Sequence, residues 1–177
     1  MRRITVVHRS ALWLCFAAVA GSLAGCGTGP LAFHNDHRLA FVSPAARSLV
    51  HTPLTVRWSM REFHLTGLDG SRNPAQGTFA VFVDRAPMPV GADLKWFAAH
   101  DPGCQRNPAC PDGTYLANRG VHLTTDASLT LDVLPPVAAG VGDEQHSVTV
   151  VLLDGAGRRF AESAWYLPFT SPHRGSR

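Results

Sequence analysis

Hydrophobic and polar residues alternate with a period of two over much of the chain. Residues 54–61 (LTVRWSMR) place Leu, Val, Trp and Met on one face and Thr, Arg, Ser and Arg on the other. Residues 129–133 (LTLDV) repeat the pattern. Because successive side chains of a strand point to opposite faces, both segments are predicted to be half-buried strands of an antiparallel sheet.

Two further runs, 78–84 (TFAVFVD) and 148–153 (VTVVLL), are apolar on both faces and predict central strands of a packed sandwich. Further strands are expected at 39–43, 122–125 and 159–169. Residues 154–157 (DGAG) separate two strand patterns and predict a hairpin turn. A helical turn is expected over 95–100, and no longer amphipathic helix follows from the pattern.

About seven short strands without alternating helices predict an all-β fold, an antiparallel β-sandwich over residues 39–170. In the number of its strands this body resembles the immunoglobulin-like and fibronectin type III-like modules of exported bacterial proteins. Trp58 is expected in the core, on an earlier strand than the antibody tryptophan. Cys104 and Cys110 are too close in sequence to form the inter-sheet disulfide of antibody domains.

The N-terminus has the pattern of an export signal. Arg2, Arg3 and Arg9 precede an apolar segment over residues 11–20, which small residues follow. An apolar segment of about ten residues is too short to cross about 30 Å of hydrocarbon. Residues 1–25 are therefore predicted to be a signal peptide.

Residues 23–26 (LAGC) resemble the lipobox of bacterial lipoproteins. The resemblance implies that a diacylglyceryl group is attached to the thiol of Cys26 and that cleavage before Cys26 frees an α-amino group. The alternative is an ordinary signal peptide with a chance cysteine. In the lipoprotein interpretation, residues 26–38 form a lipidated tether and residues 171–177 a disordered tail.

Length and charge limit the number of domains and the kinds of binding partner that the sequence allows. The chain has 177 residues, of which 45% are hydrophobic and 16% are charged, as expected for one folded domain. Removing the signal peptide removes three arginines, so 13 basic residues (16 − 3) face 13 acidic ones. Zero net charge leaves no electrostatic basis for nucleic-acid binding.

Two cysteines remain besides Cys15 in the signal peptide and the lipid carrier Cys26. Cys104 and Cys110 are separated by five residues, and in an exported protein this spacing predicts a small disulfide loop. A metal site is the weaker interpretation, because the spacing is wider than in zinc knuckles and no second Cys/His pair completes the ligand set.

The nine histidines, of which His8 leaves with the signal peptide, raise a second functional hypothesis. Many histidines in an exported protein suggest copper or zinc binding. No His-x-His or His-x3-His pair occurs, so a site would require convergence in the tertiary structure. His122 and His146, on predicted strands, are the candidates, and scattered strand-end and surface histidines are the alternative.

No motif of a known enzyme class occurs: the chain lacks G-x-S-x-G, H-E-x-x-H and a P-loop. Asp84 and Arg85 are interpreted as the end of a strand, with an exposed ion pair or a turn cap, and Asp143, Glu144 and His146 as polar residues where a loop meets a strand. No catalytic residue and no cofactor is predicted.

The sequence therefore favours a non-enzymatic lipoprotein anchored in the bacterial cell membrane or outer membrane. It would face the periplasm or the exterior and contact an unidentified envelope protein. The alternative is an envelope protein that binds copper or zinc.

Overall fold

The computed structural model describes residues 36–136 and 142–172. The chain divides into two units, Met1–His34 and Asn35–Arg177, and the second unit contains all of the described residues. The predicted signal peptide, the predicted lipid carrier Cys26, most of the predicted tether and residues 173–177 of the predicted tail lie outside this part. Among the described residues, no helix has the length and apolar character needed to cross a membrane.

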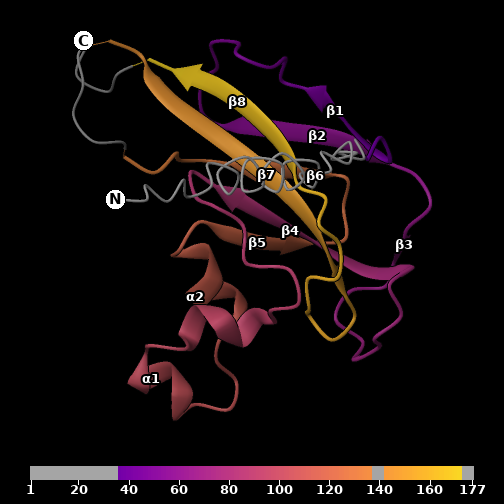
Figure 1. The fold of residues 1–177 in the computed structure, drawn as a ribbon. Helices are drawn as coiled ribbons and strands as arrows, with labels where there is room; N and C mark the ends of the chain where they lie inside the picture. Colours follow the sequence, from indigo (N-terminus) through magenta and orange to yellow (C-terminus); the bar gives the residue numbers. More distant parts are fainter. Residues whose placement is uncertain (1–35, 137–141, 173–177) are drawn as a thin grey trace, which may run out of the picture. The chain divides into compact units, whose positions relative to one another are not determined.

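The second unit contains two β-sheets (Figure 1). Sheet A has the order β1-β2-β6, with strands at Leu39–Ser43, Leu54–Met60 and Ser128–Leu131. Sheet B has the order β3-β4-β7-β8, and β5 also pairs with β4. Its strands are His64–Leu65, Gln76–Val83, Val121–Thr124, Glu144–Asp154 and Trp165–Ser171, which are β3, β4, β5, β7 and β8.

The predicted all-β sandwich is confirmed, because side chains from both sheets share one hydrophobic core. Trp58 of β2 is 3% exposed and packs edge-to-face on Phe79 of β4, with 5.4 Å between the ring centroids. Most strand pairs are antiparallel, as expected. Two contacts are parallel: β3 with β4, and a bridge from Leu49 to Thr170 of β8.

Strands β4 and β7 pair from Gly77–Asp154 to Val83–Val148 and form the centre of sheet B. The inner faces of these strands contribute to the core between the sheets, and their outer faces to a second cluster that includes Phe82 and Val151. Residues of the region between β4 and β5, such as Leu116, pack into this second cluster. Cover on both faces is the reason that these two strands lack polar alternation.

Three short helical segments lie between β4 and β5: the 3-10 helix η1 (Leu94–Ala98), α1 (Pro102–Gln105) and α2 (Gly113–Ala117). Each begins at an aspartate whose carboxylate accepts backbone N–H groups of the first turn. The helical turn expected over 95–100 corresponds to η1, whereas α1 and α2 were not predicted. The sulfur atoms of Cys104 and Cys110 are at disulfide distance, with their Cα atoms 5.2 Å apart.

The last strand differs from the prediction over 159–169. Arg159 pairs with Leu153 directly after the turn, but residues 160–164 leave the sheet and β8 begins only at Trp165. The cause is the buried guanidinium of Arg159, which donates to carbonyl oxygens on both sides of it in space, those of Met88, Ala161 and Glu162. At its other end β8 includes Ser171, one residue past the expected body.

The described chain begins with a contact to the start of β8. The indole Nε1 of Trp165 donates to the carbonyl of Asp36 (2.7 Å), and Ser163 Oγ donates to the Asp36 carboxylate (2.6 Å). Hydrogen bonds from Arg38 hold the pKa of Asp36 well below its ordinary value. The last residues assigned to the tether thus pack on the body, and the chain is attached there at Asp36.

Candidate functional site

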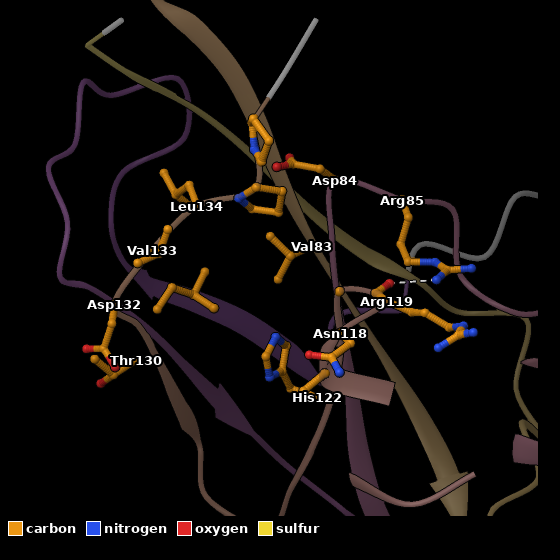
Figure 2. Close-up of a pocket in the computed structure, with 15 residues that line it drawn as sticks. Val83, Asp84, Arg85, Asn118, Arg119, His122, Thr130, Asp132, Val133 and Leu134 are labelled. Atoms are coloured by element: carbon orange, nitrogen blue, oxygen red, sulfur yellow. Dashed lines mark hydrogen bonds between the residues drawn. The ribbon is translucent and has the colours of Figure 1, made fainter. Parts of the chain in front are cut away.

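A groove of about 840 Å³ opens where the edge of sheet A faces sheet B (Figure 2). Residues 130–136, the end of β6 and the segment after it, form one wall. The ends of β4 and α2 and the beginning of β5 form the other wall. Pro135 and Pro136 lack the N–H needed to continue a ladder, which fits the end of β6 at Leu131. Leu134 is buried in the core, whereas Val133 is 64% exposed.

His122 is the one histidine in the wall of this groove. Its neighbour Val121 packs in the outer cluster, so the alternation of β5 turns His122 toward the other face of sheet B. Asn118 lines the same groove (Figure 2). Burial lowers the pKa of His122, so the neutral imidazole offers one donor and one acceptor at neutral pH.

The two arginines of the groove wall are engaged elsewhere. Arg85 donates to the carbonyl of Arg119 (2.6 Å), and its guanidinium lies over the ring of Phe97. The guanidinium of Arg119 lies 3.5 Å from the ring centroid of Tyr115 and forms a 3.3 Å ion pair with Asp101. With these contacts, both guanidinium groups lie on the opposite side of the groove from Val133 and Asp132 (Figure 2).

Asp84 connects the groove with a buried polar network. It follows β4 at φ +52°, a left-handed conformation that is uncommon for a residue with a side chain. Its Oδ1 accepts the backbone N–H of Ser147 (2.6 Å), and its Oδ2 lies 2.7 Å from Nδ1 of His146. On the other side of the imidazole, Nε2 lies 3.1 Å from Oγ of Ser171 and 3.5 Å from a carboxylate oxygen of Glu144.

Asp84, His146 and Ser171 are arranged in space as Asp, His and Ser are in a catalytic triad. The surroundings of these residues differ from those of an active site. The His146 side chain has no exposed surface, its ring stacks on Phe169, and Ser171 is 8% exposed. A nucleophilic hydroxyl has to reach its substrate, and this one is enclosed. In this structure the network joins the ends of β4, β7 and β8.

Sequence reasoning placed Asp84 and Arg85 at a strand end and left open an exposed ion pair or a turn cap. In the structure the Asp84 carboxylate accepts the backbone N–H of Ser147, and Arg85 donates to the carbonyl of Arg119. Sequence reasoning did not identify His146 as the partner of Asp84, because 62 positions separate the two residues and no local pattern connects them. The groove was missed for the same reason, since its walls come from segments far apart in the chain.

The two metal candidates have separate surroundings. His122 lines the groove, whereas His146 is enclosed by Asp84, Glu144 and Ser171. Over residues 36–136 and 142–172, no group of three or more His, Cys, Asp or Glu side chains is arranged to hold a metal ion. His34 and His173 lie outside the described residues.

Comparisons with known proteins add no relative to this geometry. No protein-family model, no curated protein and no solved structure matches the chain.

Proposed function

We propose that the mature protein is a lipid-anchored, non-enzymatic interaction module of the bacterial cell envelope, built on an immunoglobulin-like sandwich. The observation that carries the proposal is the lipobox-like sequence at 23–26, which precedes a folded β body. Two or three acyl chains attached at Cys26 bind a bilayer stably, because each buried CH₂ contributes about 0.8 kcal/mol.

Strand order supports the immunoglobulin-like assignment. The order β1-β2-β6 corresponds to strands A, B and E of such a domain, and β5-β4-β7-β8 corresponds to C′, C, F and G. The parallel bridge of Leu49 to β8 has its counterpart in an A strand that crosses to the second sheet. Trp58 then lies on strand B, whereas the antibody tryptophan lies on strand C.

An interaction role is supported by the distribution of polar groups. The buried hydroxyl of Ser171 and the buried imidazole of His146 are directed at each other and at Asp84. In the groove, the polar residues Thr130 and Asp132 are exposed next to the exposed side chain of Val133. About half of the residues that line the groove are polar or charged, so it offers hydrogen-bonding groups beside apolar contacts.

The anchor is tested with Cys26→Ser, and Cys15→Ser is the matched control because Cys15 lies within the segment to be removed. We expect the wild type and Cys15→Ser to remain with membranes in high salt, and Cys26→Ser to be released or left unprocessed. Mass spectrometry should find acyl groups on an N-terminal Cys26. A processed polypeptide without acyl groups would contradict the proposal.

The interaction role is tested in intact cells with a photo-crosslinking amino acid at Val133 in the groove. Val42 on β1 is the control, because it is equally exposed (67% against 64%) and lies outside the groove. We expect a discrete crosslinked protein from position 133 and none from position 42. Failure of both positions to crosslink any protein would count against an interaction module.

A further inference from the structure

One edge of sheet A is open beside the groove. Strand β6 pairs with β2 alone. Trp58 N–H donates to the carbonyl of Ala127 (3.0 Å), and in this antiparallel register alternate residues of β6 turn their backbone groups toward β2. The backbone N–H and C=O groups of Leu129 and Leu131 are therefore directed at β2, whereas those of Thr130 point away from β2. In the described part of the chain, no strand pairs with β6 on this outward side.

The open edge leads directly into the groove. Thr130 and Asp132 belong to the same groove wall, and Val133, Leu134 and the two prolines continue it. A backbone that presents an outward N–H and C=O is matched by a second extended backbone, which is the basis of recognition by strand addition. The exposed Val133 provides an apolar contact for a side chain of that second strand.

The charge available in the groove is negative. Asp132 is exposed and forms no ion pair within the described residues. The carboxylate of Asp84 in the other wall is engaged with His146 and the backbone N–H of Ser147, and the guanidinium groups of Arg85 and Arg119 are engaged with Arg119 O, Phe97, Tyr115 and Asp101. Asp132 is therefore the charge that the groove leaves available among the described residues. A basic side chain at Asp132 is therefore favoured over an acidic one.

We infer that the groove binds an extended polypeptide segment of a partner protein, which pairs with the Thr130 edge of β6 and places a Lys or Arg side chain against Asp132. This inference rests on the proposed function as an interaction module and specifies what the module recognises. The partner segment can pair in the parallel or the antiparallel direction, since the edge of a strand can form hydrogen bonds in both.

The test uses blocked octapeptides of alternating Val and Thr that carry Lys, Gln or Glu at one central position. A fourth peptide keeps the Lys but is N-methylated at alternate residues, so that it cannot pair with a strand edge. Binding to the purified full chain in detergent is measured by fluorescence anisotropy. The protein variants are Asp132→Lys and, as a matched control on the loop before β6, Asp126→Lys; Asp126 is also exposed and its side chain forms no ion pair in the described region.

We expect the Lys peptide to bind more tightly than the Glu peptide, and the N-methylated peptide to lose binding. Asp132→Lys should weaken binding of the Lys peptide about fivefold or more and reverse the preference for Lys over Glu, whereas Asp126→Lys should leave this preference unchanged. Absence of Lys-peptide binding, equal binding of the N-methylated peptide, or indifference to Asp132→Lys would overturn the inference. These results do not depend on acylation, so failure here is distinct from failure of the lipid anchor.

Discussion

Nδ1 of His146 lies 2.7 Å from Oδ2 of Asp84, and this contact joins the end of β4 to the beginning of β7. A carboxylate only accepts hydrogen bonds, so Nδ1–H is the donor. In the neutral imidazole Nε2 is then an acceptor for the hydroxyl of Ser171 on β8. Three strands of sheet B are thus connected by one buried ring beside the groove.

Replacing Asp84 should separate the effect of this hydrogen bond from that of the backbone. Asp84→Ala removes both acceptors and places alanine at φ +52°, so we expect a loss of about 2–4 kcal/mol in the free energy of unfolding. Asp84→Asn tolerates the left-handed conformation and retains one acceptor, so it should cost about half as much. Urea unfolding of both variants measures the difference, and equal losses would show that the amide cannot replace the carboxylate.

Arg159 should be essential for the course of the chain between the β7 turn and β8. Its guanidinium is buried and donates to three backbone carbonyls, which alanine would leave without partners. We expect Arg159→Ala to lower the free energy of unfolding by about 3 kcal/mol. The neighbouring Arg158 is exposed, and Arg158→Ala should cost less than about 1 kcal/mol in the same denaturation experiment.

Gly77 at the start of β4 leaves no space for a side chain. Its φ is +149°, and a Cβ atom there would overlap the carbonyl oxygen of Leu153 on β7. Gly77→Ala should therefore destabilise the protein by about 2 kcal/mol or more, as judged by the thermal midpoint. Gly113 in α2 has open space around it, so Gly113→Ala should be neutral or slightly stabilising. Similar midpoints for the two variants would contradict the tight pairing of β4 with β7.

The cysteine loop should stabilise the helical region locally. A loop this short contributes about 2 kcal/mol in the chain-entropy model, and Cys104→Ser with Cys110→Ser should lose that amount. Hydrogen exchange should increase first over η1, α1 and α2, while β4 and β7 stay protected. A uniform increase across both sheets would instead show that the loop supports the whole sandwich.

The histidine in the groove should make stability depend on pH. Burial lowers the pKa of His122 below its ordinary value of 6.5, so the unfolded chain takes up a proton before the folded one does as pH falls. The free energy of unfolding should therefore decrease as pH drops below about 6.5, and His122→Gln should flatten this part of the curve.

Urea midpoints between pH 8 and pH 5 measure this effect. His64→Gln, at an exposed position on β3, provides the control and should follow the wild-type curve. A wild-type curve that His122→Gln leaves unaltered would show that His122 is not the group responsible.

Local alternation was sufficient to locate most strands. Residues 39–43 and 54–61 coincide with β1 and β2 to within one residue, since a half-buried strand repeats its environment every second position. The doubly apolar runs correctly indicated β4 and β7, because each is covered on both faces. The signal peptide and the lipobox are likewise predictions of sequence alone.

Other features depend on contacts between residues that no short pattern connects. The delayed start of β8 follows from Arg159, whose carbonyl partners include Met88, 71 positions away. The Asp84–His146–Ser171 network spans separations of 62 and 25 positions, and the groove exists only because β6 and β5 belong to different sheets. Periodicity records which face of a strand is buried, but it does not record which distant segment buries it; that was decided by the packing of one sheet against the other.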